Sequence, residues 1–260
     1  MMQRSGLEEI SNGLSQLYRS IGQFKSFLNR PEVKAQLRTF FDEIAKIPED
    51  TKRFLADLAY RGWFLTDAMT LNELSVFYAL ATAQNSVDET QIDDVMEAMI
   101  ERYINHIKSR LFERFPGRRS VLEAAFGAHE RGEYDLAMPV FLAQADGIGA
   151  ELLNGVSPFS RRSASGGMLA TGAAINALSS RVDTILIESL GLPLGMTANT
   201  ASAERRQHAH IYNRHEILHG VSLDYGNKTN SLKAISLLGH LATMLYDVVE
   251  EYRAAEATQK

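Results

Sequence analysis

The stretch DETQIDDVMEAMIERYINHIKSRLFERF, residues 88–115, decides the fold class of this chain. Its apolar residues recur every three or four positions, which places them on one face of an α-helix. Charged side chains occupy the positions between them, and Pro116 and Gly117 follow at once and end the pattern. A helix of this length with one apolar face must bury that face against neighbouring elements.

The same helical spacing continues through most of the chain, and no segment shows the two-residue alternation of a half-buried strand. An apolar stripe from Leu7 to Leu28 predicts an N-terminal helix, which suits either core packing or a coiled coil. Residues 31–47 and a segment after Pro48 are expected to be helical as well. The sequence therefore predicts an all-α fold, a multi-helix bundle.

Two capping boxes predict where helices begin. In this arrangement a Ser or Thr hydroxyl accepts a hydrogen bond from the backbone three residues later, and a Glu at that position reaches back. Thr70 with Glu73 predicts one helix, and Ser120 with Glu123 predicts another. The second leads into YDLAMPVFLAQADGIGAELL, residues 134–153, and the two segments form an αα-hairpin.

The C-terminal half contains a polar, basic loop at 157–167 and then three expected helices. They cover residues 171–190, a segment from about Ser202 to His219 that ends at Gly220, and residues 232–252. A boundary near Pro116 would give an N-terminal helical region (1–116), a C-terminal helical domain (117–252) and a disordered tail (253–260).

Composition narrows the class of protein. The chain has 260 residues, 45% of them hydrophobic and 23% charged, as in ordinary globular proteins. A formal net charge of −5 argues against coating nucleic acid by bulk positive charge, but it leaves room for a local basic cleft. The absence of Cys removes disulfides and thiolate zinc sites. Without a signal peptide or an expected membrane span, we expect a cytoplasmic protein.

The segment NRHEILHG, residues 213–220, allows two interpretations. From His215 it reads H-E-x-x-H, in which His215 and His219 share one helix face and bind zinc while Glu216 acts as general base. That interpretation needs a third protein ligand and usually a sheet edge for the substrate, and the sequence predicts no sheet. The candidate third ligands downstream are Asp224, His240, Glu250 and Glu251.

From Arg214 the same segment reads R-x-x-x-x-H and suits RNA cleavage without a metal. That reaction needs a base that takes the proton of the 2′-hydroxyl and an acid that gives a proton to the leaving oxygen. It also needs a cation that stabilises the negative charge on the phosphorane. Histidine titrates near neutrality, and arginine offers a charged, planar fork to phosphate. On one helix Arg214 and His219 would lie about 140° apart and border a shared surface.

Here the chain resembles the HEPN superfamily of helical ribonucleases, found in toxin–antitoxin, abortive-infection and CRISPR-associated systems. The family motif is an arginine followed by a polar residue and, four to six residues after the arginine, a histidine; Arg214, His215 and His219 match these places. Gly220 and the downstream DYGNKTNSLKAISLL look like the turn and closing helix of abortive-infection-type members. The resemblance covers residues 120–252 and implies a C-terminal HEPN-like helical domain.

The resemblance also implies roles for the site residues. His219 would be the general base or acid, Arg214 would hold the scissile phosphate, His215 would orient both, and Asn213 would add a hydrogen bond. No cofactor is implied. The expected partners are an RNA substrate, a second copy of the chain that completes a composite cleft, and an antitoxin or other defence protein. Members that have lost catalysis serve as interaction modules, which leaves a non-enzymatic alternative.

Further basic residues could track an RNA backbone, although such clusters are more often a solvated face. The candidate substrate-binding residues beside the motif are Arg205, Arg206 and His210, and the loop at 157–167 adds Arg161 and Arg162. Glu216 departs from the family pattern, because its carboxylate would repel a phosphate unless it points away or pairs with Arg205 or Arg206.

Overall fold

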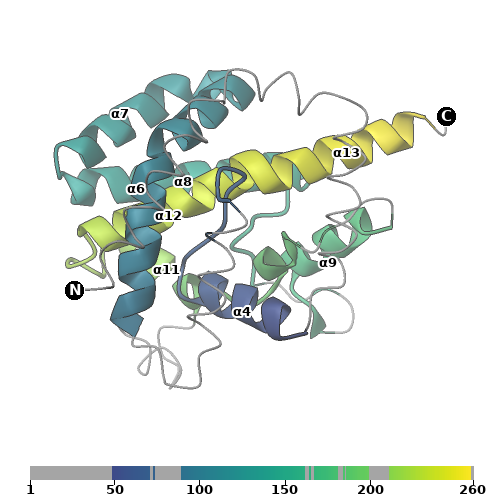
Figure 1. The fold of residues 1–260 in the computed structure, drawn as a ribbon, viewed down its shortest axis with the longest axis horizontal. Helices are drawn as coiled ribbons and strands as arrows, with labels where there is room; N and C mark the ends of the chain where they lie inside the picture. The colour runs from purple at the N-terminus through teal and green to yellow at the C-terminus, as the bar shows by residue number, and fades with distance from the viewer. Residues whose placement is uncertain are drawn as a thin grey trace, which may run out of the picture. The chain divides into compact units, whose positions relative to one another are not determined.

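The computed structural model describes residues 49–70, 73, 89–161, 164, 167–180, 184, 186–198 and 211–258. Within these ranges the regular structure is helical, apart from an isolated bridge at Leu169 (Figure 1). The all-α prediction is therefore confirmed for the described residues. The helices expected in residues 7–47 lie outside them.

The α-helices and the shorter helical turns follow one another along the chain. The α-helices are α4 (Glu49–Tyr60), α6 (Glu89–Arg114), α7 (Arg119–Glu130), α8 (Tyr134–Leu152), α9 (Ala170–Leu178), α11 (Arg214–Leu218), α12 (Lys228–His240) and α13 (Tyr246–Ala257). The 3-10 turns are η1 (Pro116–Arg118), η3 (Glu188–Gly191) and η4 (Gly195–Thr197), and a π-helical turn, η5 (Leu241–Leu245), joins α12 to α13.

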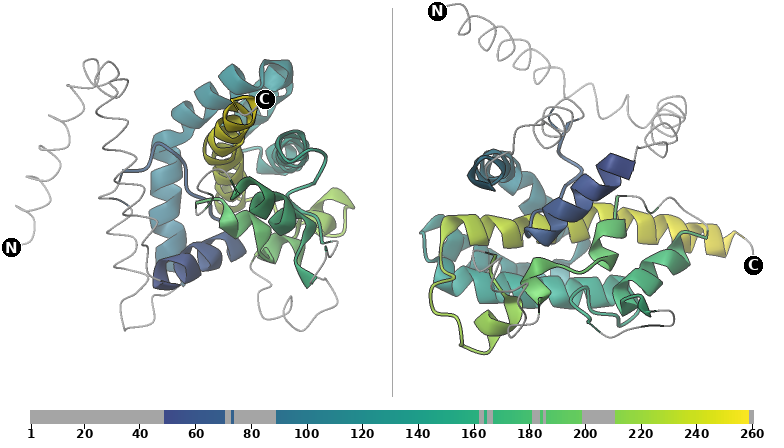
Figure 2. Two further views of the ribbon diagram at one scale, coloured as in Figure 1. Left: turned by 90° about the vertical axis from the view of Figure 1, so that its right-hand side faces the viewer. Right: turned by 90° about the horizontal axis from the view of Figure 1, so that it is seen from below.

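A continuous helical rod made of α12, η5 and α13 runs through the fold, and α6 crosses it (Figures 1 and 2). Helix α12 packs against both α6 and α8. The rod spans 30 residues and is long and apolar enough to cross a membrane by length and composition, but 78% of its most apolar window is buried inside the fold. The core helix of a soluble protein has the same properties, so this burial accounts for the apolar character of the rod.

Helix α6 forms over almost the whole stretch that decides the fold class. The centre of its apolar stripe is fully buried, at Met96, Ile100, Ile107 and Leu111. The structure groups Glu49–Lys260 into one compact unit, so the expected boundary near Pro116 does not separate two cores among the described residues. The reason is the direct packing of α6, before that proline, on α12 after it.

The two capping boxes have different outcomes. Thr70 and Glu73 exchange the predicted bonds, with Thr70 N donating to Glu73 Oε2 (2.8 Å) and Glu73 N donating to Thr70 Oγ1 (3.3 Å). The box at Ser120 is wrong, because η1 continues directly into α7 at Arg119 and no side chain caps that helix. Glu123 instead accepts a hydrogen bond from Arg119 Nε at 2.8 Å.

Helices α7 and α8 form the predicted αα-hairpin and pack against each other. Gly132 makes the turn with φ +76°, a left-handed conformation that glycine adopts without a Cβ clash. The hairpin places α8 between α7 and the central rod, and α8 also contacts α11. Helix α8 thereby lies beside the candidate site through its contact with α11.

The helix expected at 171–190 is wrong in its length. Helix α9 ends at Leu178, where the hydroxyls of Ser179 and Ser180 donate to the carbonyls of Asn176 and Ala177. These bonds compete with continuation of the helix. Residues 186–191 form a turn and η3.

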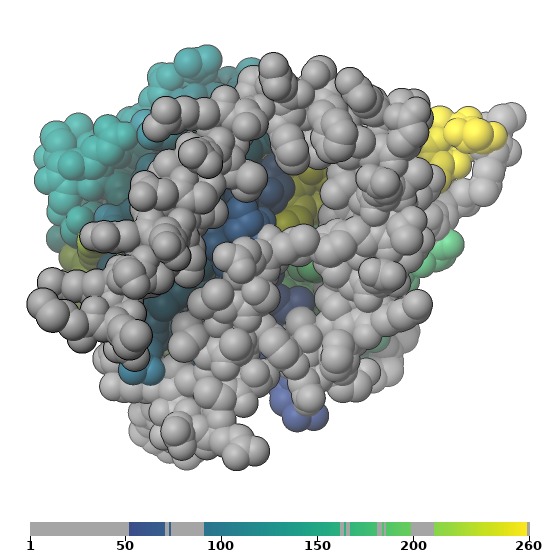
Figure 3. All heavy atoms as spheres, in the orientation of Figure 1, coloured from purple at the N-terminus to yellow at the C-terminus, as the bar shows by residue number. Residues whose placement is uncertain are grey.

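The last helix is longer than expected at both ends. It begins at Lys228, since the Asn227 side chain accepts a hydrogen bond from Asn230 N at 2.9 Å and caps the first turn. At the other end α13 continues to Ala257, so residues 253–257 of the expected disordered tail are helical. Figure 3 shows this C-terminal end, in yellow, at the surface.

Candidate active site

The motif NRHEILHG folds as a short helix with a signal at each end. Asn213 is extended (φ −113°, ψ 118°), and its side chain accepts hydrogen bonds from His215 N (2.9 Å) and Glu216 N (3.2 Å). Helix α11 therefore begins at Arg214. Residues 211–213 are not helical, so the predicted continuous helix up to His219 is wrong in its described part.

The helix ends at Gly220, as the sequence predicts. Gly220 has φ +68° and donates to Ile217 O at 3.1 Å, while Val221 N donates to Glu216 O at 2.7 Å. These two bonds make a Schellman motif, which terminates a helix with a left-handed residue. Arg214 thus lies at the first position of a short helix, and His219 caps the opposite end.

His215 and His219 lie on the same side of α11, as their spacing predicts. Their ring centroids are 4.3 Å apart and their planes are tilted by 49°. Both residues are exposed. The two imidazoles therefore present a contiguous, solvent-accessible pair of groups that can accept or donate protons.

Arg214 is held by a side chain that the sequence analysis did not single out. Asp146, on α8, accepts a hydrogen bond from Nη2 of Arg214 and another from the hydroxyl of Ser157. The Arg214 guanidinium lies over the Phe159 ring, with Cζ 4.6 Å from the centroid, a cation–π geometry. Its Nε is buried and has no acceptor in the part of the chain that the structure describes.

The segment after α8 is fixed in place by close contacts. Phe159 N donates to Ser157 Oγ at 3.1 Å, and Thr171 Oγ1 donates to Ser157 O at 2.9 Å. The Pro158 ring packs on α8 at Gly149, where an added Cβ would lie only 2.5 Å from Pro158 Cγ. These contacts explain how Phe159 comes to lie beneath the Arg214 guanidinium.

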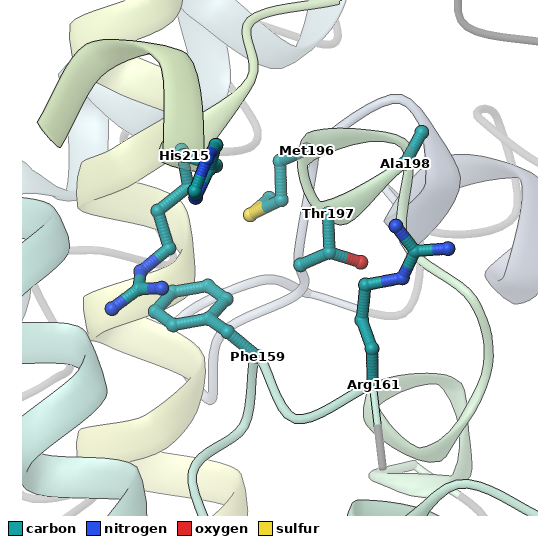
Figure 4. Close-up of a pocket in the computed structure, with 7 residues that line it drawn as sticks. Phe159, Arg161, Met196, Thr197, Ala198 and His215 are labelled. Carbon is teal, nitrogen blue, oxygen red and sulfur yellow. The ribbon is translucent and has the colours of Figure 1, made fainter. Parts of the chain in front are cut away.

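A cavity of about 310 Å³ lies next to the first turn of α11. The loop after α8 contributes Phe159 and Arg161 to its lining. The turn η4 and the residue after it contribute Met196, Thr197 and Ala198, and α11 contributes Arg214 and His215. Figure 4 shows Arg161 and His215 approaching it from opposite sides, with Met196 and Thr197 between them. Arg161, Arg214 and His215 thus line one hollow together with the apolar side chains of Phe159 and Met196.

The wall formed by η4 is tied to α11 by the side chains of Asn213, the first residue of the motif, and of Tyr212 before it. The Asn213 amide donates from Nδ2 to Ala198 O at 2.9 Å, so a single side chain caps α11 and links it to the cavity wall. Tyr212 is buried, with its hydroxyl 3.6 Å from Met196 Sδ. Burial raises the pKa of this phenol far above its ordinary value, and Tyr212 is part of the core beside the cavity wall.

The structure brings together some of the predicted site residues and places others apart. Asn213, Arg214 and His215 surround the cavity or its wall, and His219 lies next to His215 outside the cavity lining. Arg205, Arg206 and His210 lie outside the described residues, as does the expected pairing of Glu216 with the two arginines.

Asp146, Phe159 and Met196 are site residues that the sequence analysis missed. The available signal was a carboxylate at Asp146 set between small residues of an otherwise apolar helix segment. A charged group in such a place usually requires a partner. The sequence does not say which cation that partner is.

The zinc interpretation requires a third ligand close to His215 and His219. Among the described residues no group of three His, Asp or Glu side chains could hold a metal ion. Of the candidate third ligands, His240 is buried in the core, with Nδ1 2.7 Å from Leu65 O, and Glu250 pairs with Arg253 on α13 at 2.7 Å.

Comparison with family models, curated proteins and solved structures found no match to this chain. The geometry of the site and the chemistry of its side chains are therefore the grounds for a functional proposal.

Proposed function

We propose that this protein is a metal-independent endoribonuclease of HEPN type, with its active site at the first turn of α11. The observation that carries the proposal is the meeting of Arg214, His215 and Arg161 around one cavity. Arg161 is not part of the motif at residues 213–220, so its place in the same cavity is an observation independent of the motif. A phosphate is the ligand that two guanidiniums and an imidazole suit best.

In the proposed reaction the ribose 2′-oxygen attacks the adjacent phosphorus and the bond to the 5′-oxygen of the next nucleotide breaks. His219 takes the 2′-hydroxyl proton or gives a proton to the leaving oxygen, and His215 orients the reacting groups. Arg214 stabilises the negative charge that builds up on the phosphorane. The products are a 2′,3′-cyclic phosphate and a 5′-hydroxyl, so water is not the nucleophile in the cleavage step.

The ion pair with Asp146 is compatible with this role. A guanidinium has five N–H donors in a fixed plane, and Asp146 accepts from Nη2. Because Nε is buried, the two Nη1 hydrogens and the second Nη2 hydrogen are the donors left for a phosphate while Asp146 keeps the plane oriented. The carboxylate also reduces the positive charge that attracts a phosphate. Its contribution to the site is therefore to fix the orientation of the Arg214 guanidinium.

A second copy of the chain would complete the site. His219 is exposed at the end of α11, and a single copy does not enclose it. Large apolar side chains follow it directly, with Val221 69% exposed and Leu223 85% exposed. Exposed apolar residues of this kind favour a protein contact. A homodimer through this segment would bring two His219 side chains to one cleft and supply both a base and an acid.

One observation favours a non-catalytic alternative. Arg214 has structural partners in Asp146 and Phe159, so the motif also serves to join α11 to α8 and the loop after it. An interaction module would keep the motif for this reason alone. The phage-defence or toxin–antitoxin setting and an antitoxin partner follow only from the family resemblance, whereas the cytoplasmic location follows from the composition of the sequence; all three belong to the same proposal.

The decisive experiment measures cleavage of single-stranded RNA by the purified chain in excess chelator. Cleavage is expected to persist, with a 2′,3′-cyclic phosphate at the product end. Arg214→Ala and His219→Ala should each lower the rate at least about a hundredfold. Arg214→Lys retains a charge near Asp146 but lacks the planar fork, so it should lose most of the activity while keeping more of the stability.

Matched controls separate the alternatives. Arg131→Ala changes an exposed arginine paired with Glu133 and should leave the rate unchanged. Glu216→Gln should be nearly harmless, whereas a zinc peptidase would lose its general base. Stoichiometric zinc in a chain that leaves RNA intact would favour the peptidase. A chain without metal or nuclease activity, in which Arg214→Ala only lowers stability, would favour the interaction module.

A further inference from the structure

Among the described residues, Arg161 is the basic group of the cavity that has no charged partner. The Arg214 guanidinium on the other side is paired with Asp146. No ion pair or hydrogen bond involves the Arg161 side chain among the residues that the structure describes. A negatively charged group entering the cavity therefore meets the full charge of Arg161. In Figure 4 this side chain lies across the cavity from His215 and Phe159.

Two polar groups of the η4 wall are already engaged. Thr197 Oγ1 donates to Leu194 O at 2.9 Å, and Ala198 O accepts from Asn213 Nδ2 at 2.9 Å. The remaining lining is apolar, from Phe159 and Met196. Such a cavity offers a ligand apolar contacts between Arg161 and the Arg214–His215 side, and its described lining leaves few polar groups to read the edge of a base.

We propose that the cavity binds one nucleotide of the RNA substrate next to the scissile phosphate, with Arg161 holding that nucleotide's other phosphate. The inference rests on the proposed ribonuclease function and names the subsite where the substrate strand is held. The scissile phosphate lies at the Arg214 and His215 side, and the base and ribose lie over Phe159 and Met196. Arg161 is a binding residue here, and it takes no part in proton transfer.

The size of the cavity supports a single nucleotide. A volume of about 310 Å³ is at the lower end of the range for small-molecule sites, roughly 300–1,000 Å³. A folded or double-stranded RNA cannot enter a hollow of that size, but one unstacked nucleotide of a single strand can. Because few wall groups remain to read base edges, we expect only weak preference among the bases.

The test measures binding of a short, fluorescently labelled single-stranded RNA of mixed sequence to the full chain carrying His219→Ala. If the chain is a nuclease, His219→Ala keeps the RNA intact during the measurement. If it is not, this substitution should not affect RNA binding. Adding Arg161→Ala should weaken binding about tenfold and reduce the slope of log K against log salt by about 0.7. Arg161→Lys should recover part of the affinity and part of the salt slope. Arg131→Ala, the exposed control, should alter neither quantity.

In the otherwise unsubstituted chain, Arg161→Ala should raise KM with little change in kcat, the reverse of Arg214→Ala. Equal RNA affinity with and without Arg161→Ala overturns the subsite, even if the chain cleaves RNA. Arg161-dependent binding by a chain that never cleaves RNA supports the subsite and overturns the nuclease. A chain that binds no RNA overturns both.

Discussion

Asp146 and Arg214 lie 68 residues apart in the chain and meet as an ion pair that joins α8 to α11. Ser157 donates to the same carboxylate, so one side chain fixes both the motif arginine and the loop that carries Phe159. The position of the arginine thus depends on a helix that contains no part of the motif.

The first prediction concerns Asp146→Asn, which keeps the shape of the side chain and removes its charge. Without the carboxylate, Arg214 is held less firmly, and cleavage of RNA should show a kcat lower by about tenfold. Because a negative charge near the phosphate is lost, RNA affinity should stay the same or increase. Steady-state kinetics separate the two effects, and Asp94→Asn, an exposed change on α6, is the control. A fall in affinity alone would contradict an orienting role.

Asn213→Ala should have two consequences, because this side chain caps α11 and also donates to Ala198 O. Loss of the cap costs about 1 kcal/mol of unfolding free energy, and loss of the buried hydrogen bond adds about 1 kcal/mol. Asn227→Ala removes only the cap of α12 and is the matched control. Chemical denaturation gives the stabilities. Equal losses for the two variants would show that the link to Ala198 contributes nothing.

Gly195→Ala tests whether η4 is placed by close backbone contact. The added Cβ would lie 2.4 Å from Tyr60 O at the end of α4, so one of the two segments must shift. We expect a loss of about 1–3 kcal/mol in stability together with weaker RNA binding, since Met196 and Thr197 follow directly. Gly117→Ala has no atom within 4 Å of the new Cβ and should change stability by less than about 0.5 kcal/mol. A well-tolerated Gly195→Ala would rule out this contact as a constraint.

His240 predicts a pH dependence of stability. Burial lowers the pKa of this imidazole from 6.5 to about 4, so the unfolded chain takes up a proton between these values while the folded chain does not. Stability should therefore fall as the pH drops from about 6.5 to about 4, by up to about 3 kcal/mol from this group. His240→Gln should flatten the curve of unfolding free energy against pH. His129 acts in the same direction, because burial lowers its pKa too, so part of the slope should remain.

The exposed segment after α11 predicts the oligomeric state. If Val221 and Leu223 form a contact between two copies, light scattering at micromolar concentration should report a dimer, and Leu223→Asp should convert it to a monomer. Val121→Asp changes an exposed apolar residue on α7 and should leave the dimer intact. A parent chain that is monomeric under these conditions would argue against a composite site.

Sequence periodicity predicted the parts of the fold that depend on long apolar faces. Helix α6 and the α7–α8 hairpin lie close to where the spacing places them. The errors arise where a single polar side chain redirects the backbone, as at Asn213, Asn227 and Ser179. Each makes a local hydrogen bond that ends or begins a helix, and an apolar pattern contains no information on that choice.

The candidate site was only partly accessible from the sequence. Asn213, Arg214, His215 and His219 were found because they are neighbours in the chain. Asp146, Phe159 and Met196 join them only through the packing of α8, the loop after it and η4. Arg161 was noted as a loop arginine, and only the fold distinguishes it from an ordinary solvated one.

The cap at Asn213 has a consequence for how the sequence ahead of the motif can vary. In a helix that ran unbroken through residue 211, each inserted or deleted residue upstream would rotate the motif by about 100°. Because Asn213 starts α11 afresh and its amide is anchored to Ala198, the rotational phase of Arg214 and His219 is set locally. A length change between Ala198 and Ile211 would therefore leave the motif facing the cavity.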